Sequence, residues 1–391
     1  MLNTSLSPWP SFTQEEADAV SRVLLSNKVN YWTGSECREF EKEFAAFTGT
    51  QYAVAVANGT LALDVALKAM GIGAGDDVIV TSRTFLASAS CIVTAGANPV
   101  FADVDLNSQN ISAETIKAAL TPNTKAVIVV HLAGMPAEMD GIMDLAKEHD
   151  LWVIEDCAQA HGAKYKGKSV GSIGHVGAWS FCQDKIMTTG GEGGMVTTND
   201  KELWSKMWSY KDHGKSYDAV YHREHAPGFR WLHESFGTNW RMMEMQAVIG
   251  RIQLKRMPEW TARRQAHAAK LAESLGKFAS IRLIEVADYI EHAQYKFYAF
   301  VKPEHLKEGW TRDRIVNELN ARKVPCYQGS CSEVYLEKAF DNTPWRPKER
   351  LKNAVELGDT SLMFLVHPTL TDDEIAFCKE HIEAVLAEAT A

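Results

Sequence analysis

The sequence predicts an α/β protein in which a mostly parallel central sheet is flanked by helices. Short runs rich in valine, isoleucine and alanine recur through the first half of the chain, at 53–57, 78–80, 100–104, 126–130, 151–154 and 195–198. Helical patterns, such as those over 112–120 and 141–148, lie between several of these runs. Strands that alternate with helices favour a parallel sheet covered on both faces.

Two amphipathic helices are predicted before the first strand. Thr13 and Glu16 form a capping-box pattern, which is typical of a helix start. Phe40, Phe44 and Phe47 recur at the spacing of one helical face. Both helices are therefore expected to pack an apolar face on the protein.

The length of 391 residues exceeds the usual size of one domain. A long helical stretch is expected to end near Met257, and Pro258 marks a domain break. Beyond it we expect a long helix from about residue 263, a strand over 295–301 and a helix near 311–322. We predict a large domain over 1–257, N-terminal arm included, and a smaller C-terminal α+β domain over 258–391.

Composition excludes several classes of function. A net charge of −9, with both signs well mixed, disfavours nucleic acid as the main partner. Seven cysteines without a CxxC pair disfavour a disulfide framework and fit a reducing compartment. The N-terminus lacks a signal-peptide pattern, and no apolar run reaches about 18 residues. We therefore predict a cytoplasmic protein without membrane insertion. His222 and His225 lack a third ligand at suitable spacing, so no metal site is predicted.

Three segments place reactive groups where strands end, which is where parallel sheets bind ligands. Asn58-Gly59-Thr60 precedes a helix and suits a phosphate, or it is only a turn with an N-cap. Asp156 ends an apolar run; a buried carboxylate needs a cationic partner such as a protonated pyridine nitrogen, unless it simply caps a helix. Lys185 precedes a glycine-dense loop and is a candidate for a Schiff base, although most lysines are solvated surface groups.

Four segments in order carry a family resemblance: Asn58-Gly59-Thr60, EDCAQAHGA from Glu155, SFCQDK with GEGG after it, and TNWRMMEMQAVIG from Thr238. With them the chain resembles the DegT-type sugar aminotransferases, from about Pro8 to His367. The resemblance implies a fold-type I aminotransferase whose large domain binds pyridoxal 5'-phosphate (PLP).

The resemblance also assigns residues. Lys185 corresponds to the lysine that carries the cofactor and Asp156 to the carboxylate beside its pyridine nitrogen, and both are expected to be catalytic. Phe85 stacks on the ring and Gln159 lies on the side of the ring hydroxyl. The phosphate is contacted by Gly59, Thr60, Ser180 and Asn239. Asn239 reaches in from the partner subunit, which implies a homodimer with shared active sites.

The expected reaction moves an amino group from L-glutamate to a keto- or aldehyde-sugar. Nucleotide-sugar members usually carry a His-Tyr-x-Pro-Leu-His segment, of which only Tyr327 is in place here. Arg223 and Arg230 are candidates for binding a substrate carboxylate. These departures disfavour a nucleotide sugar as the acceptor. The resemblance, taken over the whole sequence, implies C8 of oxidised 3-deoxy-octulosonate instead, which gives the 8-amino sugar of lipopolysaccharide.

Three alternatives remain open: a nucleotide-sugar 3- or 4-keto aminotransferase, a PLP-dependent sugar dehydratase and a non-catalytic regulator. Related dehydratases have histidine in place of the lysine, so Lys185 favours transamination.

Overall fold

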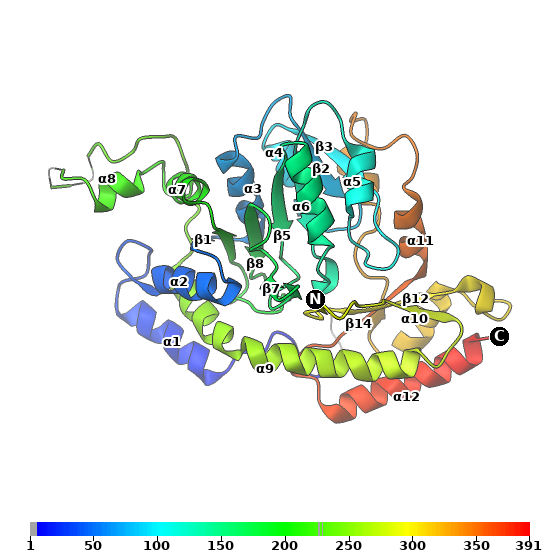
Figure 1. The fold of residues 1–391 in the computed structure, drawn as a ribbon. Coiled ribbons are helices and arrows are strands. Elements are labelled where there is room, and N and C mark those ends of the chain that lie inside the picture. The colour runs from blue at the N-terminus through cyan, green and yellow to red at the C-terminus, as the bar shows by residue number, and fades with distance from the viewer. Residues whose placement is uncertain (1–5, 226, 229) are drawn as a thin grey trace.

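A seven-stranded sheet forms the centre of the computed structural model, which describes residues 6–225, 227–228 and 230–391 (Figure 1). Its strands, in spatial order, are β1 (Tyr52–Val56), β9 (Gly194–Thr198), β8 (Val176–Ser180), β5 (Trp152–Asp156), β4 (Thr124–Val130), β2 (Asp77–Thr81) and β3 (Asn98–Ala102). β9 runs antiparallel to both of its neighbours, whereas the pairings from β8 through β3 are parallel. The predicted mostly parallel sheet is confirmed.

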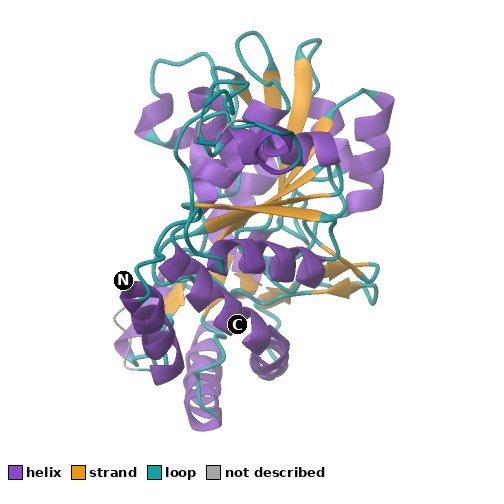
Figure 2. Cartoon of the chain, turned by 90° about the vertical axis from the view of Figure 1, so that its left-hand side faces the viewer, coloured by secondary structure: helices purple, strands orange, loops and turns teal. Residues whose placement is uncertain are grey.

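Helices cover both faces of this sheet (Figure 2). Because successive side chains of a strand point to opposite faces, Val54 and Val56 join one core and Ala53 and Ala55 the other. The first face is covered by α3 (Gly59–Ala69), α4 (Ala87–Thr94) and α7 (Lys201–Tyr210). The second is covered by α2 (Glu36–Thr48), α5 (Ala113–Ala119), α6 (Met139–Glu148) and part of α9 (Glu244–Leu275).

Both predicted N-terminal helices are present. α1 (Gln14–Leu25) begins with the expected capping box between Thr13 and Glu16. In α2, Phe40 and Phe44 are fully buried against the sheet, and Phe47 packs at the edge of the same core.

The predicted end of a helix near Met257 is wrong. α9 continues through Pro258 and runs along the lower side of the molecule in Figure 1. Proline removes one backbone hydrogen bond, but apolar packing on both sides of it keeps the helix continuous. Leu254 and Met257 pack on the core of the large sheet, and Leu271 and Leu275 pack on the C-terminal core. The division at 257/258 stays a prediction.

The C-terminal part is built on an antiparallel sheet with the order β10 (Ile281–Leu283), β12 (Phe297–Val301), β14 (Ser361–Phe364) and β13 (Cys326–Tyr327). α10 (Arg312–Ala321) and α12 (Asp372–Ala389) pack on it together with the end of α9. The predicted strand and helix in this region are confirmed.

The remaining elements are short. β11 (Ile290–Glu291), β6 (Lys164–Tyr165) and β7 (Lys168–Ser169) form a small sheet. α8 (Tyr217–Tyr221) lies in a segment that projects from the body (Figure 1), and α11 (Lys352–Thr360) precedes β14. None of the helices within the described ranges has both the length and the apolar character of a membrane span.

Candidate active site

The carboxyl ends of the parallel strands bring the predicted residues to one edge of the sheet. Asp156 ends β5, Ser180 ends the neighbouring strand β8, and His131 follows β4. The backbone N–H of His131 donates to the carbonyl oxygen of Asp156 (3.1 Å), which fixes the two strand ends together. This edge is where a parallel sheet binds its ligand.

Asp156 is a buried carboxylate with neutral hydrogen-bond donors. Ser88 Oγ donates to Oδ2 (2.8 Å), and the backbone N–H of Ala158 donates to Oδ1 (3.1 Å). Burial raises the pKa of the Asp156 carboxyl, against the effect of these hydrogen bonds and of the charge on Lys185. A cationic ring nitrogen beside Asp156 would favour the ionised form.

Replacement of Ser88 by alanine should move the acid limb of the pH–activity profile to higher pH. The Ser88 hydrogen bond favours ionised Asp156, so its loss raises the pKa of Asp156, and activity disappears sooner as the pH falls. Near neutrality kcat/KM should fall on the order of tenfold, because a hydrogen bond to a charged group contributes about 1.5–3 kcal/mol. Ser90→Ala on the same helix is the control, and equal profiles for the two variants would contradict this role.

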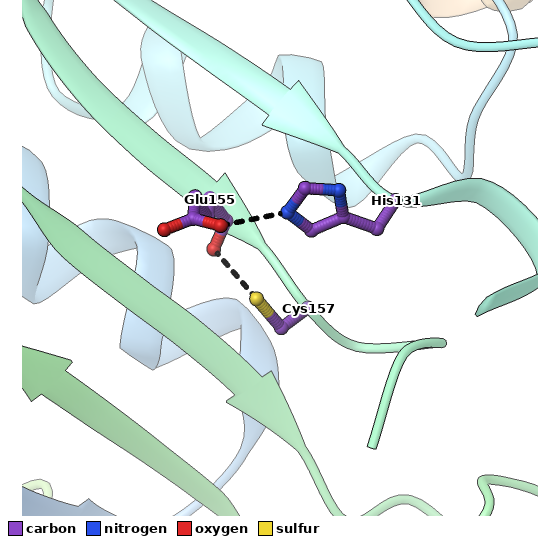
Figure 3. Close-up of side chains that lie close together, drawn as sticks. All are labelled: His131, Glu155 and Cys157. Atoms are coloured by element: carbon purple, nitrogen blue, oxygen red, sulfur yellow. Dashed lines mark hydrogen bonds and ion pairs between the residues drawn. The ribbon is translucent and has the colours of Figure 1, made fainter. Parts of the chain in front are cut away.

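His131, Glu155 and Cys157 lie close together at the ends of β4 and β5 and are all buried (Figure 3). His131 Nδ1 accepts from the backbone N–H of Ala137 (3.0 Å), so Nε2 carries the proton that is donated to Glu155 (2.9 Å). The Glu155 carboxylate also accepts backbone N–H groups of Gly171, Ile173 and Gly174. Burial opposes its ionisation, yet the hydrogen bonds from His131, Gly171 and Gly174 lower the pKa of Glu155.

These hydrogen bonds make the group a support for the strand ends. Burial raises the pKa of the Cys157 thiol well above its usual value, and its Sγ lies 3.6 Å from the carbonyl oxygen of Glu155. Zinc ligands of this kind need a thiolate and free lone pairs. That no metal takes part stays a prediction.

Gln159 has a fixed side-chain orientation. Its Oε1 accepts the backbone N–H of Ala133 (2.8 Å), a residue with a positive φ of 57°. The amide Nε2 is therefore directed away from this contact and can donate to a ligand oxygen. This suits the predicted position beside the ring hydroxyl of the cofactor.

The N-terminus of α3 lies directly against Ser180. A Cβ on Gly59 would lie 2.5 Å from Ser180 Cβ and 2.9 Å from its Oγ, so only glycine fits. Asn58 caps the helix by accepting the N–H of Leu61 (3.0 Å). Free backbone N–H groups beside a serine hydroxyl form a cradle suited to a phosphate, with Thr60 in the first turn.

Substitution of Gly59 by alanine should weaken PLP binding on the order of tenfold to a hundredfold, because overpacking costs about 1–3 kcal/mol. Gly73→Ala is the matched control, since its Cβ would contact only the carbonyl oxygen of Ala95, at 3.8 Å. Titration of the apoenzyme with PLP measures both affinities. Unchanged affinity of the Gly59 variant would contradict the cradle.

Lys185 lies in the turn after β8, and its ammonium group lies over the ring of Tyr295, 5.3 Å from the centroid. Its carbonyl oxygen accepts the indole N–H of Trp9 (2.9 Å). A cavity of about 800 Å³ opens beside this turn, bordered by Trp9, Asp184 and the glycine loop at Gly190. Burial, together with the charges of Lys185 and Arg264, lowers the pKa of His161 to about 3, so this histidine is neutral.

Phe85 and Asn239 are both exposed within one chain. Phe85, which follows β2 at the same edge, is 70% exposed and so is free to stack on a ring. Asn239 pairs with Asp212 in an isolated bridge, and the carbonyl oxygen of Trp240 accepts the N–H of Ala57 (2.9 Å). The Asn239 segment therefore lies beside the end of β1, close to the start of α3.

The three predicted substrate residues lie apart from the cofactor residues at the sheet edge. Arg223, in the projecting segment, forms ion pairs with Asp218 (2.7 Å) and Glu234 (2.6 Å), and Arg230 is exposed in the same segment (Figure 1). Tyr327 packs against the core of Leu365, which borders the cavity.

Several groups of this site escaped the sequence reasoning. Ser88 and Thr84 form a chain of hydroxyl groups to Asp156, with 2.9 Å between their oxygens. Trp9 and Lys296 come from distant parts of the chain. Of these groups, only the hydroxyls could have been predicted from the sequence, because Thr84 and Ser88 are one helical turn apart directly after a predicted strand.

Comparisons with known proteins agree with this fold. The model of the DegT/DnrJ/EryC1/StrS aminotransferase family matches residues 10–383. A UDP-N-acetyl-3-dehydro-alpha-D-glucosamine 3-aminotransferase from Acidithiobacillus ferrooxidans is 44% identical over 363 residues, 91% of this chain and 90% of that protein. GDP-perosamine synthase from Escherichia coli O157:H7 is 33% identical over 377 residues, 95% and 96% of the two chains. The X-ray structure of an aminotransferase from Psychrobacter cryohalolentis superposes with a TM-score of 0.96 at 65% identity, covering 98% of this chain and 99% of that one.

The chain is a PLP-dependent aminotransferase that acts on sugars. It belongs to the DegT/DnrJ/EryC1/StrS aminotransferase family. The residues at the sheet edge fit PLP: a buried carboxylate that accepts hydrogen bonds from neutral donors, a phosphate cradle at α3, an amide whose N–H groups can donate to a ligand, and an exposed aromatic ring.

Proposed function

We propose that this chain transfers an amino group from L-glutamate to a keto- or aldehyde-sugar, with Lys185 and Asp156 as the catalytic residues. The observation that carries the proposal is that the loop with Lys185 follows β8, the strand beside β5, and that β5 ends at the buried carboxylate of Asp156. Bound PLP supplies an electron-accepting ring that stabilises negative charge at the substrate carbon.

The residues divide the work. Asp156 holds positive charge on the ring nitrogen, and Ser88 keeps that carboxylate ionised and oriented. Lys185 holds the cofactor and moves a proton at the substrate carbon that exchanges its amine. Gly59, Thr60 and Ser180 bind the phosphate, Gln159 donates to the ring hydroxyl and Phe85 stacks on the ring.

We infer a homodimer with shared sites. Trp231 and Phe236 are 90% and 99% exposed, and large apolar side chains exposed to this extent are typical of a protein interface. In such a dimer the projecting segment would bring Arg223 and Arg230 toward the site of the partner subunit, and Asn239, beside the end of β1, would reach that site from the body of the chain. Tyr327 would contact the substrate from the side of the cavity that Leu365 lines.

The proposed acceptor is the oxidised C8 of 3-deoxy-octulosonate, whose product is the 8-amino sugar of lipopolysaccharide, made in the cytoplasm. Surplus positive charge around the cavity suits an acceptor that carries a carboxylate. A nucleotide-sugar 3- or 4-keto acceptor is the second candidate, because the curated relatives above act on nucleotide sugars by name. Neither a dehydratase nor a regulator is favoured by any contact of Lys185.

Incubation of the holoenzyme with L-glutamate and a panel of acceptors tests these assignments. The proposal predicts 2-oxoglutarate and an amino sugar with oxidised octulosonate. Turnover with nucleotide keto-sugars alone would leave the transaminase assignment intact and reject the octulosonate acceptor. Loss of water from the sugar without amine transfer would indicate the dehydratase.

A further inference from the structure

A strap formed by the N-terminal residues 6–12 borders the cavity beside Lys185. Residues 6–10 and Phe12 form one wall, and Asp184, Lys296, Leu365 and His367 form much of the other. The backbone N–H of Ser7 donates to Glu374 at the start of α12 (2.6 Å), and Trp9 donates to the carbonyl oxygen of Lys185. The strap therefore joins the C-terminal part of the chain to the catalytic loop.

Lys296 carries a buried positive charge into this cavity. Its side chain is only 9% exposed, and its Nζ lies 4.6 Å from the centroid of the Tyr295 ring. Among the residues with described positions, no hydrogen-bond acceptor or ion-pair partner is found for this ammonium group. An ammonium group has three N–H donors, and Lys296 lines the cavity, where a ligand oxygen can accept them.

A second unpaired cation lies behind Lys296. Arg264 is fully buried under Trp9, with its guanidinium carbon 5.0 Å from the ring centroid. Its Nη1 donates to the carbonyl oxygen of Tyr295 (3.3 Å), while Nε and Nη2 have no partner in the described part of the chain. Burial lowers the pKa of Arg264 to about 9, which still leaves it charged near neutrality.

Asp184 is the carboxylate that interacts with Lys296 and Lys185, and it also accepts a hydrogen bond from Tyr295 Oη. Lys185, Lys296 and Arg264 are three cations, whereas Asp184 and Asp156 are the two carboxylates that interact with them, so the surroundings of the cavity are net positive. Buried charges of one sign are stable only when a counter-charge compensates them. A bound anion at Lys296 would complete the balance.

We propose that Lys296 is a substrate-binding residue that receives a carboxylate group in this cavity. The inference rests on the proposed function, because it takes Lys185 as the reacting amine. Both ammonium nitrogens lie near the Tyr295 ring, 5.3 Å and 4.6 Å from its centroid, so a substrate that reacts at Lys185 can extend a carboxylate to Lys296. The amino-acid donor and an acidic sugar acceptor are the two sources of such a group.

Carboxylate binding should depend on pH. Burial lowers the pKa of Lys296 to about 8; Asp184 opposes this shift, and Arg264 and Lys185 add to it. His367 also faces the cavity, but burial and the charges of Arg264 and Lys296 lower its pKa to about 3, so it is neutral. Lysine is charged below its pKa, and carboxylate affinity should therefore fall as the pH rises through about 8.

Calorimetric titration of the holoenzyme with glutarate tests the proposal without turnover. Lys296→Met should weaken glutarate binding on the order of tenfold to a hundredfold, because a charged hydrogen bond contributes about 1.5–3 kcal/mol. Lys296→Arg should retain most of the affinity. Lys125→Met, an exposed lysine at the start of β4, is the control and should not change it. Unchanged glutarate affinity in Lys296→Met, with PLP content and melting temperature preserved, overturns the proposal.

Half-reactions separate the two sources. In the glutamate half-reaction, the absorbance of the cofactor changes as its amine is exchanged. If Lys296→Met needs a higher glutamate concentration than wild type for half of this change, the carboxylate belongs to the donor. A change confined to the reaction with an acidic sugar assigns it to the acceptor. The wild-type holoenzyme could transfer no amine and still bind glutarate. If Lys296→Met then weakens glutarate binding, the result counts against the proposed function and not against the subsite.

Discussion

Lys185→Ala should lower the rate of the glutamate half-reaction on the order of 10⁴-fold or more, since the variant lacks both the covalent attachment of PLP and the proton-transferring amine. PLP would still bind through the phosphate cradle at α3, which does not involve Lys185. The absorbance of the holoenzyme should therefore shift to that of non-covalently held PLP. Stopped-flow absorbance with L-glutamate measures the rate.

Lys164→Ala removes an exposed lysine outside the site and should behave as wild type. A Lys185→Ala enzyme that retains the wild-type rate and spectrum would contradict the assignment of the cofactor lysine. The melting temperature of the apoenzyme should change little, because the Lys185 side chain makes no hydrogen bond within the described residues.

Asp156→Asn should lower kcat on the order of 10³-fold, the size of effect seen when a group that stabilises transition-state charge is removed. Asparagine has the same shape, but its single side-chain oxygen can keep only one of the two acceptor positions, which bind Ser88 and Ala158 in the wild type. It has no negative charge to keep a ring nitrogen protonated. PLP should still bind, so the loss should appear in kcat and not in PLP content.

Asp64→Asn provides the matched control. Asp64 is also a carboxyl whose pKa is raised by burial and which accepts a hydroxyl hydrogen bond, from Thr94 (3.1 Å), but it lies outside the site. Its variant should retain full activity. Equal losses in the two variants would mean that Asp156 acts through stability and not through chemistry.

The alternation of apolar runs and helical patterns was sufficient to predict the layers of the fold. Parallel strands buried on both faces are apolar throughout, so β2, β4 and β5 were recognisable from valine and isoleucine alone. The direction of β9 was not predictable, because strand polarity is set by its pairing with β1 and β8. β8 itself contains Gly177 and Trp179, which obscure a strand pattern.

Pro258 shows why local signals fail at a helix that joins two cores. Proline disfavours helix continuation locally, but the packing of Met257 on one side and Leu271 on the other outweighs one missing hydrogen bond. Information of that kind lies in tertiary contacts and not in neighbouring residues.

The residues of the site also divide into those that local sequence patterns reveal and those that only tertiary contacts reveal. Asp156 was predictable because it ends an apolar strand, and Lys185 because it precedes a glycine loop. Lys296 and Arg264 were not, because a lysine or an arginine in a sequence is ordinarily solvated. Trp9, from the distant N-terminus, packs on Arg264 and lines the same cavity as Lys296, and a contact of this kind is not visible in the sequence.

Reduction of the holoenzyme with borohydride, followed by proteolysis and mass spectrometry, tests the central assignment most directly. The account predicts a single pyridoxyl-phosphate modification on the peptide that contains Lys185, and its absence in Lys185→Ala. Modification of Lys296 in the wild-type enzyme, or no modified lysine with PLP bound, would contradict it.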